Sequence, residues 1–522
     1  MSGIEQKQFS SRVSLNVIVN LVQTVLTALI GLVMVPYYLG YMGPAIYAMI
    51  PLVTSVNAYV MILTGPLGAA ISRYVFESAS SKDYGLINRT YNSALFGLLK
   101  YVAMLVPLCI LVSFASPFVF DTGGAVDSDV QIFFLLILLS SLALVVSSSI
   151  GCMFDTTNST YKVGSIKIVY TVLQTAIIIA LFTAQGASLP YIGYAYLVAA
   201  IVMVCLVIVT TRRSFPELEI SRKYYDKELF KRILNFGSWI ILYQFGIMLY
   251  IDVSLILCNL LIGSEMQGLF AIAANILNMT MTVTTTFSAV VTPLLYNYYA
   301  EHDTEGLIRT LNLFVKFIGV LLAFPVIYVL VFLPQLMETW IGAGYEALYP
   351  LLYLMLPIQF GVCLVKPLEM VPATFKHVRL PAIATIFFGI MNIVLALTLT
   401  SYYECTADSI AIAWMLSISA LNMIFVPIYC TRLLKRKMSN FYIRLVWSYG
   451  VFLITGVVLY ELSKFVTIYT GWLEVLIPLM VGYLVYLLIF LGIGFNKNER
   501  KILFSFLPMT IQRKLLKLFR QA

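Results

Sequence analysis

Polar side chains recur at helical spacing within an apolar stretch near the N-terminus. Arg12, Asn16, Asn20, Gln23 and Thr27 follow one another at intervals of 4, 4, 3 and 4 residues. Such intervals place side chains on one face of an α-helix. Amide and hydroxyl groups there can exchange hydrogen bonds with a hydroxyl-rich ligand, and a guanidinium can bind an anionic one. The row predicts a polar surface on an otherwise apolar helix.

Two more rows of this kind follow later in the chain. They comprise Thr54, Asn57 and Thr64, and then Asn275, Asn278, Thr282 and Thr285. Hydrogen bonding between membrane helices uses the same residue types. For any single residue it is a better explanation than a role in a cavity. Three such rows favour a hydrophilic cavity instead, because polar side chains within a bilayer face the bundle interior or water. The candidate substrate-binding residues are therefore Asn16, Asn20, Gln23, Asn57, Asn275 and Asn278.

Asp252 is the only acidic residue that we place well inside a membrane span. A charged carboxylate at a helix centre costs roughly 2.5–3.5 kcal/mol on insertion scales unless it is paired or hydrated. Three roles are open at this point: a cation or proton site, a partner for a basic residue, or a structural group that reaches toward the surface. We take Asp252 as the candidate ion-coupling residue.

Basic residues lie near one end of several apolar segments. Arg12, Arg73, Lys100 and Lys316 are the candidates for contact with a charged substrate group. Each alone is explained by its position at the membrane surface. Together they would ring a vestibule suited to phosphate, which accepts charge-assisted hydrogen bonds from Arg and Lys.

Metal and covalent chemistry have little support in the sequence. The seven cysteines are scattered without a C-x-x-C pair, and there are only two histidines, His302 and His377. Neither pattern is typical of a zinc site or a disulfide framework. We therefore expect no catalytic residues, no metal and no cofactor.

The elements that must position these residues are membrane helices. Hydrophobic residues make up 61% of the 522 residues and charged residues 11%, against about 45–50% and about 25% in soluble proteins. A bilayer core of about 30 Å needs roughly 20 apolar residues per helix. We predict an all-α polytopic membrane protein with about fourteen transmembrane helices, at about 12–36, 44–72, 91–114, 131–154, 165–186, 190–211, 232–262, 266–299, 309–334, 346–371, 380–401, 408–431, 441–463 and 472–495.

The basic residues orient this arrangement. With fourteen helices, 32 of the 33 Lys and Arg residues fall on the side of the N-terminus, and Lys464 falls on the other. The positive-inside rule then places both termini in the cytoplasm of a multi-pass protein of the cell membrane. Attraction to anionic membrane lipids accounts for the net charge of +9, so no nucleic-acid partner is expected.

The chain contains an internal repeat. The string GLINRT begins at Gly85 and GLIRT begins at Gly306, while LGYMGPAIYA (39–48) corresponds to IGSEMQGLFA (262–271). Helices 1–6 and 7–12 therefore form a duplicated unit, with a substrate site expected between the copies. The predicted organisation is a six-helix lobe at 1–211, an inter-lobe linker at 212–231, a second lobe at 232–434, two additional helices at 435–495 and a basic amphipathic tail at 496–522.

Several stretches resemble the polysaccharide or oligosaccharide flippases of the O-antigen type, within the superfamily that includes multidrug extrusion antiporters and the lipid II flippase. They are SRVSLNVIVNLVQTVLTALIGLVMVPYYLGYMGPAIYA (11–48), GPLGAAISRY (65–74), IDVSLILCNLLIGSEMQGLFAIAANI (251–276) and METWIGAGYEALYPLLYLMLPIQF (337–360). The turn YMGPAIYA departs from that family's pattern, because it has Pro44 where an acidic or other polar residue is usual.

The resemblance implies a two-lobed bundle that moves a polyprenyl-diphosphate-linked oligosaccharide from the cytoplasmic to the outer leaflet for cell-surface polysaccharide synthesis. The implied partners are that lipid-linked substrate and the membrane lipids, and other membrane proteins of polysaccharide assembly stay open as partners. A cation-coupled multidrug antiporter, with Asp252 as its ion site, is the alternative on the same scaffold. A membrane polymerase or glycosyltransferase is a more remote alternative, because the only sequence feature that suggests one is the short acidic pair Asp127 and Asp129.

Overall fold

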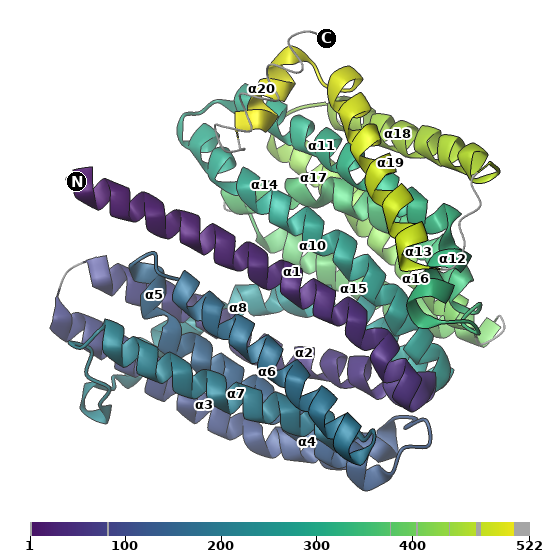
Figure 1. Ribbon diagram of the computed structural model, residues 1–522. Coiled ribbons are helices and arrows are strands. Elements are labelled where there is room, and N and C mark those ends of the chain that lie inside the picture. Colours follow the sequence, from purple (N-terminus) through teal and green to yellow (C-terminus); the bar gives the residue numbers. More distant parts are fainter. Residues whose placement is uncertain are drawn as a thin grey trace. The chain divides into compact units, whose positions relative to one another are not determined.

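A computed structural model describes residues 3–80, 83–375, 377–402, 406–437, 439–465 and 471–505 (Figure 1). Nearly all of these residues are helical, and no β-strand occurs among them. The chain divides into two compact units. Unit 1 comprises residues 1–271 and 385–410, and unit 2 comprises residues 272–384 and 411–522.

Unit 1 contains the helices of the first half and parts of α10, α15 and α16 from the second. Its helices are α1 (Gly3–Tyr47), α2 (Met49–Ser80), α3 (Tyr84–Val119), α4 (Asp127–Gly151), α5 (Met153–Thr156), α6 (Tyr161–Gln185), α7 (Leu189–Ser214), the 3₁₀ turn η1 (Arg222–Tyr224), α8 (Lys227–Met248), α9 (Ile251–Leu261), the start of α10 (Ser264–Ala300), most of α15 (Arg379–Tyr402) and the start of α16 (Ala407–Ser419). In Figure 1, α3, α4, α6 and α7 run side by side. The predicted lobe boundaries at 211 and 232 follow the sequence repeat, whereas the compact unit extends further and then takes in α15.

Unit 2 holds most of the remaining helices. They are the rest of α10, α11 (Thr304–Val331), α12 (Leu333–Ile341), α13 (Leu348–Val365), η2 (Lys366–Glu369), α14 (Met370–Thr374), the rest of α16, the π-helical turn η3 (Ala420–Phe425), α17 (Val426–Leu433), α18 (Ser439–Ser463), α19 (Trp472–Ile493) and α20 (Lys497–Ser505). The short α20 begins the predicted amphipathic tail, and the rest of that tail lies outside the described residues.

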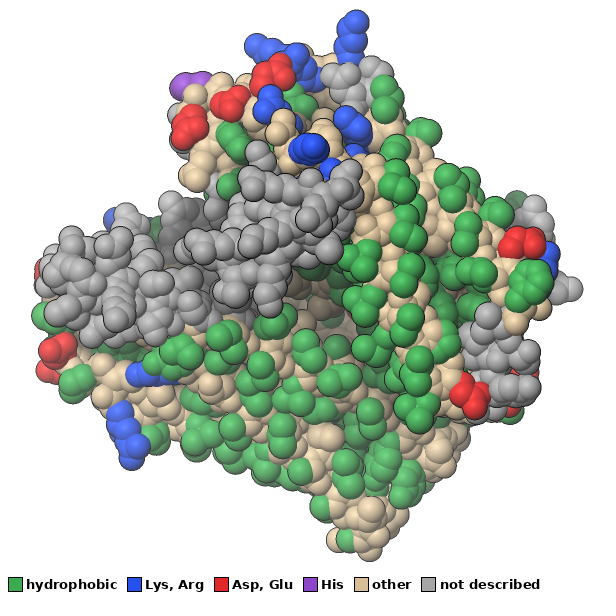
Figure 2. Space-filling view, turned by 45° about the horizontal axis from the view of Figure 1, so that its top comes forward, with side chains coloured by type: hydrophobic (Ala, Val, Ile, Leu, Met, Phe, Trp, Pro, Cys, Tyr) green, Lys and Arg blue, Asp and Glu red, His purple; other side chains and the backbone are tan. Residues whose placement is uncertain are grey.

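The helices confirm a polytopic membrane protein. Within the described residues, 12 helices are long and apolar enough to cross a membrane, and the bent pair α8–α9 makes up to 13. The described part of α2 adds a shorter apolar segment, Met49–Ile62, so the predicted count of fourteen is close. Large hydrophobic side chains are exposed along most of these helices, and Figure 2 shows them spread over the visible face while charged side chains gather near its edges. Such a surface requires lipid around it.

The two repeated strings begin helices in the same way. Asp83 caps α3 by accepting hydrogen bonds from the N–H groups of Gly85 and Leu86. Asp303 caps α11 by accepting one from the N–H of Gly306. A carboxylate at this position satisfies backbone donors that the first helical turn leaves without partners. The sequence repeat therefore coincides with a repeated local structure.

The linker after α7 is held against α3. Asn88 and Asn92 of α3 are buried, and each makes two hydrogen bonds, of 2.7–3.3 Å, to backbone groups of residues 217–221. Ser93 accepts a further bond from the N–H of Asp226 at 2.8 Å. Losing such a buried partner costs about 1–3 kcal/mol. The linker is thus a fixed part of unit 1.

A polar network joins three corners at the opposite end of unit 1. Asn259 exchanges two hydrogen bonds with the backbone of Asp121, at 2.9 and 3.0 Å. The Asp121 carboxylate accepts the N–H of Ser264 at 2.7 Å, and Gln267 donates to the carbonyl of Ala48 at 3.0 Å. The corner between α1 and α2 therefore meets its repeat counterpart at the start of α10.

The departure noted at Pro44 has a structural reason. The helical run of α1 is broken at Gly43, whose φ of 71° is in the left-handed region that favours glycine. Pro44 follows this break, where no helical hydrogen bond is required from its nitrogen. The carbonyl of Pro44 also approaches Gly268 so closely that a Cβ there would lie 2.5 Å from it.

Candidate functional site: a polar cavity in unit 1

A cavity of about 610 Å³ lies among α1, α2, α4, α6 and α7. Its polar lining residues are Asn20, Gln23, Thr27, Thr64, Ser72, Ser148, Asp155, Thr160, Lys167, Tyr170 and Thr171. The helices that supply them are otherwise apolar spans. Polar groups gathered around an open space in such helices are typical of a binding site rather than of lipid contact.

The predicted row on α1 forms one wall of this cavity. Asn20, Gln23 and Thr27 line it together. They face α6, which approaches α1 closely because Gly164 lacks a side chain: a Cβ there would lie 2.8 Å from Val19. The helical spacing in the sequence thus identified three residues that share a surface.

Asn16, one turn earlier in the same row, has a structural partner. Its side-chain amide donates to the carbonyl of Asn158 at 3.0 Å and accepts the N–H of Tyr161 at 2.7 Å. These bonds fix the turn between α5 and α6, which carries Thr160 into the cavity. Asn16 therefore shapes one edge of the site by holding that turn.

Two charged residues in the cavity were not singled out from the sequence. Asp155 interacts with the hydroxyl of Ser72 and electrostatically with Lys167, and both charged side chains are exposed within the open cavity. A carboxylate accepts hydrogen bonds from hydroxyl groups, and an ammonium donates to oxygen atoms. The predicted helix ended at residue 154, which assigned Asp155 to a loop. The available clue to Asp155 was the polar string TTNSTY (156–161), which directly follows it.

The other predicted polar residues lie elsewhere. Asn57 is half-buried in α2, and its Oδ1 atom has no hydrogen-bond partner among the described residues. In α10, Asn275 is half-buried and Asn278 is exposed. None of the three lines this cavity.

Two of the four basic candidates have side chains that the structure describes, and each has its own partner within its unit. Lys316 is buried and forms an ion pair with Glu499 of α20 at 2.9 Å, with the rings of Trp447 and Phe495 beside it. The ammonium of Lys100 lies 4.0 Å from the ring centre of Tyr225. Arg12 and Arg73 belong to α1 and α2, and their side chains lie outside the described residues.

Asp252 lies just after a break in a membrane span. The helices α8 and α9 meet at 42°, and the side chain of Asn392 from α15 donates to the carbonyls of Leu249 and Tyr250 at the break, at 2.9 and 3.4 Å. Asp252 is half-buried and interacts with Ser55 of α2. It forms no ion pair within the described residues, where groups of metal-binding side chains are also absent.

This architecture of apolar helices around a polar cavity defines a multi-pass membrane protein. It is similar to the inward-facing conformation of a multidrug resistance MATE family transporter of the MOP superfamily, with 16% identity, a TM-score of 0.64, and coverage of 78% of this chain and 95% of that one. It is also similar to the lipid II flippase MurJ in its inward closed conformation, with 16% identity, a TM-score of 0.61, and coverage of 90% and 98%.

Sequence comparison narrows this class. Residues 13–299 match the family described as polysaccharide biosynthesis protein, and the chain belongs to that family. It is also 24% identical over 436 residues to the uncharacterized membrane protein EpsK of Bacillus subtilis (strain 168), covering 82% of this chain and 85% of that protein. The predicted resemblance to polysaccharide exporters is thereby confirmed.

Proposed function

We propose that this protein is a flippase for a polyprenyl-diphosphate-linked oligosaccharide, which it moves from the cytoplasmic to the outer leaflet by alternating access. The cavity in unit 1 carries the proposal, because it offers amides, hydroxyls, a tyrosine ring and a pair of opposite charges within apolar spans. These groups suit the hydroxyls of a saccharide. Membership of a polysaccharide biosynthesis family supports this substrate class.

Within this proposal, the carboxylate of Asp155 accepts hydrogen bonds from sugar hydroxyls, and the ammonium of Lys167 donates to sugar or phosphate oxygens. Asn20 and Gln23 supply further donors and acceptors along α1. The polyprenyl chain stays in the lipid beside the helices, where apolar side chains are exposed. The family match does not favour the multidrug antiporter.

The test is made in the cells that produce the protein. Deletion of its gene should cause a lipid-linked oligosaccharide to accumulate, and the intact chain should remove it. Asp155→Asn should reduce this clearance by about 10- to 100-fold, because a hydrogen bond to a charged group contributes about 1.5–3 kcal/mol. Asp127→Asn, at an exposed acid at the start of α4, is the matched control. If the deletion strain accumulates no such lipid, the proposed function is wrong.

We further propose Asp252 as the site of a coupling cation. It follows a helix break, where unwound backbone and side-chain oxygens form ion sites in transporters, and the Oδ1 atom of the nearby Asn392 is buried without a partner in the described residues. Asp252→Asn should abolish the dependence of transport on an imposed cation gradient in proteoliposomes. Transport driven equally by the gradient in this variant would contradict the assignment.

A further inference from the structure

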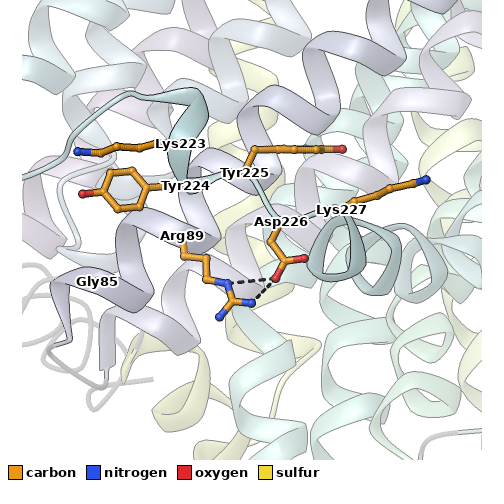
Figure 3. A pocket seen from close by; sticks show the side chains of 7 residues that line it. All are labelled: Gly85, Arg89, Lys223, Tyr224, Tyr225, Asp226 and Lys227. Carbon is orange, nitrogen blue, oxygen red and sulfur yellow. Dashed lines mark hydrogen bonds and ion pairs between the residues drawn. The ribbon is translucent and has the colours of Figure 1, made fainter.

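A groove of about 470 Å³ lies between the start of α3 and the linker that follows α7, apart from the polar cavity (Figure 3). It is lined by Gly85, Arg89, Lys223, Tyr224, Tyr225, Asp226 and Lys227. Three of these side chains are basic and one is acidic, which leaves a formal charge of +2. Its walls are fixed, because Asn88, Asn92 and Ser93 bind the linker backbone beneath it.

The guanidinium of Arg89 is oriented within the groove. Its Nε atom and one terminal nitrogen both donate to the same Oδ2 atom of Asp226. The other carboxylate oxygen, Oδ1, accepts the N–H groups of Glu228 and Leu229 at the start of α8. Figure 3 shows the second terminal nitrogen of Arg89 pointing away from Asp226. That nitrogen can donate to an added oxygen ligand without loss of the ion pair.

Further positive charge is available at both ends of the groove. Lys227 forms no ion pair within the part of the chain that the structure describes. Lys223 pairs with Glu219 at 2.7 Å, but both side chains are more than half exposed, so solvent weakens this pair. Lys100 lies against the ring of Tyr225 at the groove's edge. An anionic ligand therefore meets several donors, the Asp226 carboxylate, which already has partners, and beside the groove the Glu219 carboxylate, which is paired with Lys223 and Tyr224.

The position of the groove along α3 places it at the level of lipid head groups. The helix has 36 residues, or about 54 Å at 1.5 Å per residue, whereas the hydrocarbon core is about 30 Å thick. Apart from Tyr84 and Leu86 in its first turn, its exposed large hydrophobic side chains extend from Leu99 to Val119, which is sufficient for that core. Lys100 and the adjacent Tyr225 then mark the edge of the core, and Arg89 lies beyond it.

We propose that this groove binds the phosphate of a membrane lipid head group. A phosphate oxygen would accept from Arg89 and from the two lysines, while the tyrosines lie at the interface where their rings are favoured. Two lipids share this chemistry: an anionic phospholipid and a polyprenyl diphosphate. The proposal does not depend on the flippase function, because a head-group site can exist whether or not the protein moves a saccharide.

The full-length chain in detergent is titrated with phosphatidylglycerol and, separately, with undecaprenyl diphosphate that carries no sugar, and bound lipid is counted by native mass spectrometry. Lys223→Gln with Lys227→Gln should weaken binding by about 25-fold, since each basic group near a membrane surface contributes roughly a factor of five. This variant keeps the Arg89–Asp226 pair. The control is Arg212→Gln with Arg213→Gln, which removes the same charge from exposed positions at the end of α7.

A second variant tests whether removal of a negative charge from the groove makes lipid binding tighter. Asp226→Asn keeps a capping side chain for α8 but removes the one acid among the residues that line the groove, so binding should become tighter, a change that loss of structure would not produce. If the double lysine variant loses affinity for phosphatidylglycerol alone, the groove is a phospholipid site. If it loses affinity for undecaprenyl diphosphate alone, the groove is a site for that carrier's head group. Loss of affinity for both lipids supports a site that binds either head group. Equal effects of the groove and control variants, or no effect, overturn the proposal.

Discussion

Single residues show how far a residue type determines its role. Asn20 and Asn16 lie one turn apart on α1, yet Asn20 lines the cavity and Asn16 holds a turn. Lys316 was predicted to face a charged substrate, and the structure pairs it with Glu499 among aromatic rings. Helical spacing predicts which face a side chain occupies. The partner depends on tertiary contacts, here with α20, which lies about 180 residues away in the chain.

Asp121 provides a pH-dependent prediction at this scale. The N–H groups of Ser264 and Gly123 donate to its carboxylate and lower its pKa below the usual value. Because the pKa is lower in the folded state, the carboxylate stabilises the corner network above the unfolded-state pKa of about 3.9. That contribution is lost as pH falls through the folded-state value.

The thermal midpoint of the purified protein should therefore fall between about pH 5 and pH 3 more steeply in the parent chain than in Asp121→Asn. At pH 7 the variant should be the less stable of the two. Parallel curves for both proteins would mean that this carboxylate does not stabilise the fold.

At the scale of elements, the break between α8 and α9 depends on close packing with α15. Gly246 and Gly389 permit this approach: a Cβ on Gly389 would lie 2.5 Å from the Cβ of Leu249. The approach brings Asn392 within hydrogen-bonding distance of the carbonyl of Leu249 at the break, and of the carbonyl of Tyr250, which also accepts the N–H of Ser254. Backbone polar groups in a membrane need such internal partners.

Gly389→Ala should lower the free energy of unfolding by about 1–3 kcal/mol, because the added methyl group forces the helices apart. Gly450→Ala is the matched control, since a Cβ at that position of α18 has no atom within 4 Å. Thermal midpoints of both variants in detergent measure the effect. Equal midpoints would show that the close approach is not required.

Helix positions could be predicted from sequence because apolar length alone determines a membrane span. The repeat strings mark equivalent places in the two halves, but the helices there begin earlier than the predicted residues 91 and 309, directly after the capping residues Asp83 and Asp303. The bend at Tyr250 could not be predicted, because it has neither proline nor glycine and depends on Asn392 from a distant helix. Asp155 was missed for a related reason: a residue at the end of a span looks like a loop residue until the cavity beside it is known.

At the scale of the whole molecule, the charge asymmetry of the sequence predicts orientation. The linker with η1 should face the cytoplasm, and the loop between α3 and α4 should face outward. In intact cells, a membrane-impermeant maleimide should label Val126→Cys, which is exposed in that loop. It should label Arg222→Cys only after the membrane is permeabilised. The parent chain gives the background of the native cysteines, and the reverse labelling would invert the predicted topology.

Because most of α15 belongs to unit 1, the unit is not continuous in the chain. Synthesis on the ribosome delivers α8 and α9 about 130 residues before Asn392. During that interval the carbonyl of Leu249 lacks its native side-chain donor within the bilayer. The first half therefore completes its assembly only when a helix of the second half has been inserted. If the two halves were produced as separate polypeptides, they would have to associate in the membrane before unit 1 could complete its packing.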